Sequence, residues 1–110
     1  MTLQLPDGAA ERVDWVLVAS GRRPNVAGLG LEALGVAPDA GGFVPTDERT
    51  MTAAAGIYAI GDCANPRMTS NHALAEAAVA VANIVSPGSA RRDAGAVPEV
   101  VYSALELARL

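Results

Sequence analysis

The first hydrophobic pattern in the chain predicts a β-hairpin. Residues 2–5 alternate between polar and apolar side chains, and the Pro-Asp-Gly sequence at 6–8 is typical of a turn. Residues 13–19 then form a β-branched run that is apolar on both faces at its end. Because a strand with two apolar faces needs cover on both sides, we expect residues 13–19 to be the return strand of the hairpin and to be buried.

The rest of the pattern predicts short strands and one long helix. Residues 28–40 contain several Gly and Pro residues, which leave room for at most a short helical turn. Residues 42–45 are typical of an edge strand ending in proline, and residues 57–60 form another short apolar strand. Residues 70–85 are rich in alanine and predict a helix capped by one of its first two residues. Residues 97–102 predict a strand with no partner left in the chain. The combination of short strands and one long helix predicts an α/β fold class.

Composition narrows the class of protein. With 110 residues, 51% of them hydrophobic, the chain can form one domain with a core of ordinary size. Its net charge of −4 and scattered arginines form no basic stripe, which argues against nucleic-acid binding. The sequence has no apolar run of about 18 residues and no signal-peptide pattern, so we expect no membrane association and a cytoplasmic location. The chain has one cysteine, which excludes an intramolecular disulfide. With only one histidine in addition, the sequence offers no metal-ligand cluster of Cys and His.

The most informative site pattern is the Gly61-Asp62 pair directly after the strand expected at 57–60. Glycine lets a ligand approach the backbone closely, and an ionised carboxylate accepts strong hydrogen bonds from the hydroxyl groups of a ribitol or ribose. The alternative is that Asp62 only caps a turn, and its position alone leaves the two interpretations equally open. Gly21 also follows a strand directly, where a nucleotide can cross the strand end, although spacing alone favours a simple turn glycine.

Two segments together indicate a family. The sequence VLVASGRRPN at 16–25 and the sequence IYAIGDC at 57–63 resemble the flavin-dependent pyridine nucleotide disulfide oxidoreductases, which include dihydrolipoyl dehydrogenase, glutathione reductase and mercuric reductase. The resemblance implies an internal fragment of a Rossmann-like fold that binds FAD and NAD(P). In it, residues 1–25 end the NAD(P)-binding domain and residues 26–88 form the C-terminal part of the FAD-binding domain. Residues 89–110 are then a linker and the first strand of the dimerisation domain of a homodimeric enzyme.

The same resemblance assigns site residues. Asp62 matches the aspartate that hydrogen-bonds the ribitol of FAD, Gly21 matches a glycine that lies against NAD(P), and Met68 starts the flavin-contacting segment. That segment uses backbone amides at a helix N-terminus, where unpaired N–H groups carry partial positive charge. Glu76 matches the acid of the family's acidic-Gly pair, while Ala77 replaces its glycine. The three residues after Met68 differ from the Leu-Ala-His of dihydrolipoyl dehydrogenases, so a mercuric reductase-like member is an alternative. The residues expected to bind FAD are Gly61, Asp62, Met68, Thr69, Ser70 and Asn71.

Other candidates for chemistry are interpreted as structural. Residues 28–33 fit the dinucleotide fingerprint G-x-G-x-x-A, but no strand directly precedes them and a following glycine interrupts any helix. Cys63 has no resolving cysteine, so we expect a buried inert thiol. His72 is expected on the surface, and the adjacent Arg22 and Arg23 are expected to be a solvated pair.

The function implied by the resemblance is hydride transfer between NAD(P) and FAD, coupled to a disulfide or dithiol. No catalytic residue is predicted here, because the chain has no redox disulfide, no catalytic His-Glu pair and no phosphate-binding turn. We therefore expect a dihydrolipoyl dehydrogenase-like flavin-site fragment that is inactive alone. The alternative is a non-enzymatic protein, either a truncated remnant or a module that complements another chain.

Overall fold

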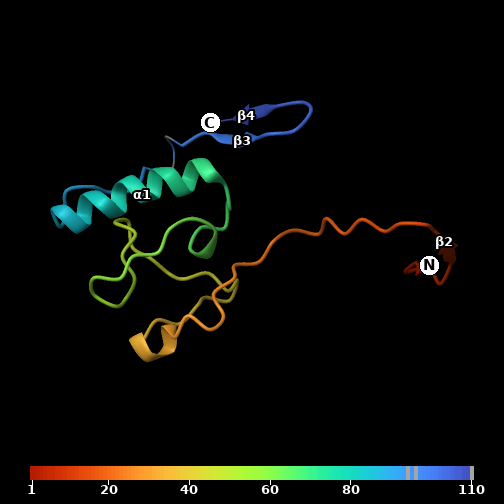
Figure 1. Cartoon of the computed structure of the whole chain (residues 1–110), viewed down its shortest axis with the longest axis horizontal. Coiled ribbons are helices and arrows are strands. Elements are labelled where there is room, and N and C mark those ends of the chain that lie inside the picture. Colours follow the sequence, from red (N-terminus) through yellow and green to blue (C-terminus); the bar gives the residue numbers. More distant parts are fainter. Residues whose placement is uncertain (94, 96, 110) are drawn as a thin grey trace.

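The computed structural model describes residues 1–93, 95 and 97–109. One long helix, α1 (Ser70–Val85), lies between a C-terminal hairpin and a set of loops, and a second hairpin stands apart at the N-terminus (Figure 1). The Cα radius of gyration is 18.7 Å. A compact domain of this length has a radius of about 13 Å, so the chain is extended rather than globular.

The N-terminal hairpin is confirmed, but its second strand begins earlier than expected. Strand β1 (Thr2–Gln4) pairs antiparallel with β2 (Ala10–Arg12), and Leu3 lies opposite Glu11. In the turn, the Asp7 carboxylate accepts a hydrogen bond of 3.0 Å from the amide of Ala9. The tight turn therefore uses residues 10–12 as its return strand.

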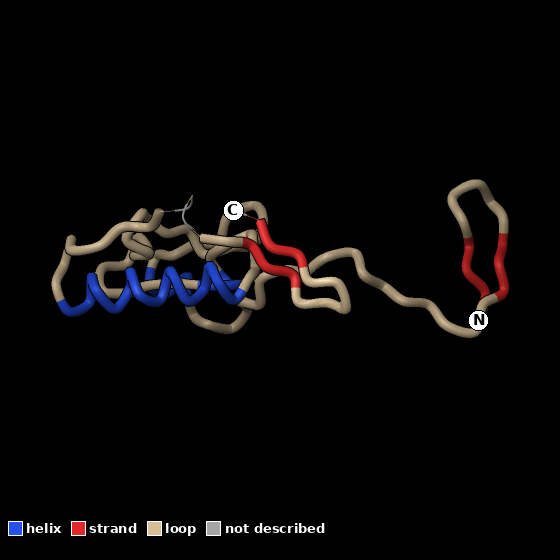
Figure 2. Tube along the Cα trace, turned by 90° about the horizontal axis from the view of Figure 1, so that it is seen from above, coloured by secondary structure: helices blue, strands red, loops and turns tan. Residues whose placement is uncertain are grey.

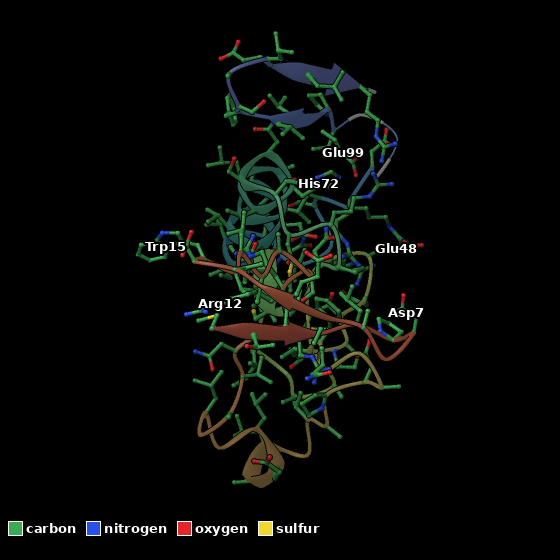
Figure 3. All side chains as sticks on the ribbon, turned by 90° about the vertical axis from the view of Figure 1, so that its right-hand side faces the viewer. Asp7, Arg12, Trp15, Glu48, His72 and Glu99 are labelled. Carbon is green, nitrogen blue, oxygen red and sulfur yellow. The ribbon has the colours of Figure 1, made fainter. Side chains whose placement is uncertain are left out.

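The prediction of a buried strand at 13–19 is wrong for this chain. In the described ranges these residues form no strand, and they cross from the hairpin to the rest of the molecule as an extended segment (Figure 2). Trp15 is 90% exposed, Leu17 is 92% exposed, and the Trp15 side chain points away from the ribbon (Figure 3). Strand propensity alone does not make a strand, because the backbone must also find a hydrogen-bonded neighbour.

The middle of the chain consists mainly of turns. A short 3-10 helix, η1 (Leu31–Leu34), lies between two glycines in the left-handed conformation, which confirms the short helical turn expected there. Residues 42–45 form no strand in the described chain, although the amide of Val44 donates to the carbonyl of Cys63 at 2.8 Å. The strand expected at 57–60 is reduced to a single bridge between Met51 and Tyr58.

Helix α1 (Ser70–Val85) has the bounds that the sequence predicts. Its N-cap is Thr69, whose hydroxyl accepts from the amide of His72, rather than one of the first two helical residues. The inner face carries mainly polar residues, and the small apolar core includes Val36 and Val44. No helix within the described ranges is long and apolar enough to cross a membrane. The buried residues of α1 are His72, Glu76, Ala80 and Asn83.

The C-terminal strand has a partner, contrary to prediction. Strand β3 (Glu99–Val101) pairs antiparallel with β4 (Leu107–Arg109), with Val101 opposite Leu107. The five intervening residues make a loop of a length common in hairpins. Of the linker expected before this strand, positions 94 and 96 lie outside the described residues.

Candidate functional site

The Gly61-Asp62 pair forms a tight turn packed against α1. The two residues belong to the 3-10 turn η2 (Gly61–Cys63), in which Gly61 has a φ of 67°. A Cβ on Gly61 would lie 3.2 Å from the Cβ of Ala73, so glycine is needed for both the backbone conformation and the close approach. This contact fixes Asp62 beside the start of the helix.

Met68 precedes the helix in an unusual backbone conformation. Its φ is 48°, in the left-handed region that residues with a side chain rarely adopt. Its amide donates to the carbonyl of Asn65 at 3.1 Å. The next residue, Thr69, is the N-cap, so the amides at the start of α1 lack intrahelical acceptors. A helix start of this kind favours a ligand that carries negative charge.

Arg22 connects the two parts of the expected flavin site. Its Nη2 forms an ion pair with the carboxylate of Asp62, and its Nη1 donates to the carbonyl of Met68 at 3.1 Å. Arg22 and its neighbour Arg23 are both exposed, as predicted, but Arg22 also makes these two contacts, which the sequence did not predict. No sequence signal distinguishes the two arginines, because the contact joins segments 40 residues apart.

The ion pair organises the site more than it stabilises the fold. The side chains of Arg22 and Asp62 are 64% and 43% exposed, and pairs this exposed contribute about 0–1 kcal/mol. The exposed part of the Asp62 carboxylate leaves it accessible to a ligand. In contrast, Asp39 accepts hydrogen bonds from the amides of Gly41 and Phe43, which is the usual role of an aspartate in a turn. The Asp62 carboxylate instead points to a cation, so turn capping does not explain its position.

Gly21 lies next to this cluster through its neighbour Arg22. It is exposed and has a φ of 109°, and no described heavy atom lies within 4 Å of the position of a Cβ. The backbone is thus open to a ligand on this side. At the other end of the cluster, Asn71 donates to the carbonyl of Pro98 at 3.1 Å, which ties the helix start to the segment before β3. Ser70 is exposed.

Two predictions about side chains near the site need correction. His72 is 4% exposed rather than on the surface, because the helix phase places it on the inner face. Its Nδ1 lies 2.7 Å from the Thr69 hydroxyl, and its Nε2 has no hydrogen-bond partner among the described residues. Cys63 is half-buried rather than fully buried, and its thiol donates to the carbonyl of Ile60 at 3.2 Å.

Charged groups also surround the helix start on the side of β3. Glu99 pairs with Arg67, which precedes the helix, and with Arg109 on β4. Hydrogen bonds from Arg109 and then from Arg67 hold the pKa of Glu99 below its usual value. The C-terminal hairpin is therefore joined to the loop that leads into α1.

A cavity of about 400 Å³ lies along the inner face of α1. His72, Glu76, Val79 and Arg92 are among its lining residues, whereas its described lining includes neither Asp62 nor Met68. The cavity is therefore separate from the cluster that Arg22 assembles.

The residues present fit the ribitol and ring side of FAD. An accessible carboxylate suits the ribitol hydroxyls, and free amides at a helix start suit the electron-rich pyrimidine edge of the ring. The structure brings Asp62, Met68 and the start of α1 together, as these two contacts require.

Comparison with known proteins identifies the family of the chain. The family model for pyridine nucleotide-disulphide oxidoreductases matches residues 1–82. Dihydrolipoyl dehydrogenase of Thermus scotoductus is 45% identical over 96 residues, which are 87% of this chain and 20% of that protein. Glutathione reductase of Burkholderia cepacia is 46% identical over 65 residues, which are 59% of this chain and 14% of that protein.

A solved structure gives the same result. The fold matches LpdA from Mycobacterium tuberculosis with a TM-score of 0.85 and 28% identity, covering 97% of this chain and 23% of LpdA. The expected fold class, a fragment of a Rossmann-like α/β fold, is thereby confirmed. The chain spans only about a fifth of the curated relatives that it matches over most of its length. It belongs to the pyridine nucleotide-disulphide oxidoreductase family.

Proposed function

We propose that this chain contributes the ribitol and isoalloxazine side of an FAD site in a dihydrolipoyl dehydrogenase-like oxidoreductase. The observation that carries the proposal is Arg22, which joins the carboxylate of Asp62 to the carbonyl of Met68 and so assembles both expected contacts at the start of α1. When bound, FAD supplies the electron transfer between a nicotinamide and a sulfur substrate.

Each part of the site has a distinct role in this proposal. Gly61 keeps the backbone close to α1, and Asp62 accepts hydrogen bonds from ribitol hydroxyls. The amides of residues 69–71 would face the flavin ring and favour the negative charge of its reduced form, and Met68, whose own amide donates to Asn65, begins this segment. Gly21 would face NAD(P), which its exposed backbone and open surroundings support. In this scheme, residues 1–25 end the NAD(P)-binding unit, 26–88 belong to the FAD-binding unit, and 89–110 lead into the dimerisation unit.

The complete reaction requires parts of the enzyme that this sequence does not contain. The redox disulfide and the phosphate-binding turns have no counterpart in the sequence, and the chain matches about a fifth of its relatives' length. Exposed apolar residues support association with another polypeptide segment, since Leu17 is 92% exposed and Leu74 on the outer face of α1 is 71% exposed. We infer that the chain is inactive alone and works as one piece of the site.

The test is a titration of the purified chain with FAD, followed by flavin fluorescence, for the wild type and Asp62→Asn. The substitution keeps the size of the side chain but removes its charge. Hydrogen bonds to a charged group contribute about 1.5–3 kcal/mol, so we expect Asp62→Asn to weaken binding by about ten- to a hundredfold.

The matched control is Asp39→Asn, which changes a turn-capping aspartate away from the site and should leave affinity unchanged. Equal affinities for wild type and Asp62→Asn would refute the role of Asp62. A folded wild-type chain without saturable binding would refute a flavin half-site in this chain.

A further inference from the structure

Helix α1 carries a buried carboxylate that is not among the residues expected to bind FAD. Glu76 is 3% exposed, at the middle of the inner face. A buried charge is costly unless donors surround it. Here Oε2 accepts from the amide of Gly61 at 2.8 Å, and Oε1 accepts from Asn65 Nδ2 at 2.7 Å and from Arg92 Nη1 at 3.3 Å. Both oxygens are thus used.

The donors come from segments that hold the two flavin contacts. Gly61 directly precedes Asp62, so the bond to its amide orients the turn that presents the carboxylate. Asn65 accepts from the amide of Met68 through its own carbonyl, at 3.1 Å. Glu76 therefore reaches both ends of the predicted contact set, one through each oxygen, although it is not itself among the residues expected to bind FAD.

The third donor joins this group to a distant loop. Besides its bond to Glu76, Arg92 donates through Nη2 to the carbonyl of Asp47 at 2.8 Å, and its amide donates to the carbonyl of Glu48 at 2.8 Å. The Arg92 guanidinium forms an ion pair with Glu76 and so balances the buried negative charge. The Arg92 side chain itself is 30% exposed. The carboxylate is thereby held by donors from a segment before the helix and from a segment after it in the sequence.

We propose that Glu76 is the positioning residue of the flavin site, which holds the Gly61-Asp62 turn and the Asn65-Met68 loop in the geometry that binds the cofactor. The proposal rests on the proposed function and deepens it. It differs from a general contribution to stability, because it assigns the effect to two named amides, those of Gly61 and Met68.

The test is Glu76→Gln in the full chain, with Glu48→Gln as the matched control. Glu48 is a carboxylate with a 68% exposed side chain that pairs with Arg91, and it lies at the periphery of the molecule (Figure 3). The glutamine side chain has a single acceptor oxygen. Its NH₂ group must therefore face at least one of the donors whose hydrogen bonds the carboxylate accepts. Amide spectra and hydrogen exchange measure the response of Gly61 and Met68, and FAD titration measures affinity.

We expect the Gly61 amide to lose its downfield shift and to exchange at least about tenfold faster in Glu76→Gln, the factor equivalent to 1.4 kcal/mol. Amides in the middle of α1, such as that of Ala80, should change less than about twofold, and Glu48→Gln should match the wild type. FAD affinity should fall by about tenfold. Equal acceleration of the Gly61 and Ala80 amides would overturn the proposal, because the effect would then be general destabilisation.

The outcomes separate this proposal from the proposed function. Unchanged FAD affinity in Glu76→Gln would overturn the positioning role while FAD binding stands. Selective loss of Gly61 protection in a chain that does not bind FAD would support the hold on the turn and refute the flavin site. If Glu76→Gln does not fold, Asn65→Ala removes one donor to Glu76 and the acceptor of the Arg67 amide, and it leaves the Gly61 donor in place. It should accelerate exchange at Met68 more than at Gly61, and equal changes at both would overturn the proposal.

Discussion

Replacing Gly61 with alanine tests the geometry that places Asp62. The residue has a φ of 67°, and a Cβ would lie 3.2 Å from the Cβ of Ala73 on the helix. Two costs therefore add. An L-residue in the left-handed region costs about 1–2 kcal/mol, and an overpacked contact between two Cβ atoms costs about 1 kcal/mol or more.

The expected loss of unfolding free energy for Gly61→Ala is thus about 2–4 kcal/mol. The matched control is Gly56→Ala, because Gly56 has a φ of 79° but no described atom within 4 Å of a Cβ position. It should lose only the backbone term, about 1–2 kcal/mol. Alanine also restricts the unfolded chain, but this effect is common to both variants and cancels in the comparison.

The assay is urea unfolding followed by the far-ultraviolet circular dichroism of α1, against which Gly61 packs. The difference between the two variants isolates the contact with Ala73. If Gly61→Ala is no more destabilising than Gly56→Ala, the turn does not press against the helix, and the described position of Asp62 is refuted.

Two further predictions follow from buried and paired polar groups. Asn83 is 1% exposed, donates to two carbonyls and accepts from the amide of Gly88 at 2.9 Å, so Asn83→Ala should cost about 2–3 kcal/mol in urea unfolding. The 61% exposed neighbour Ile84 is the control, since Ile84→Ala should change stability by only about 0.5 kcal/mol. The backbone amide of Met51 holds the pKa of Asp47 below its usual 3.8, so its stabilising effect is complete above pH 3.8 and lost as pH falls through the folded-state pKa. Asp47→Asn should therefore flatten the pH dependence of unfolding free energy below pH 3.8, and an unchanged slope would contradict this assignment.

The sequence pattern predicted correctly those elements whose backbone hydrogen bonds join residues close together in the sequence. The alanine-rich run and its polar start predicted α1 with its observed bounds, because each helical bond joins residues four apart. The Pro-Asp-Gly turn predicted the first hairpin in the same way. Predictions failed where strand formation depended on a pairing partner. Residues 13–19 found no partner in the described chain, and β3 paired with β4, a strand that the sequence analysis did not predict.

The candidate site shows the same difference between local features and contacts that join distant segments. The sequence by itself predicted Gly61, Asp62 and the start of α1 as flavin contacts through their resemblance to the family, and this assignment stays a prediction. Only the tertiary structure decided that Arg22 pairs with Asp62 and that Glu76 is buried beneath the turn. Contacts between residues far apart in sequence depend on how whole segments pack, and neighbouring residue types do not encode that packing.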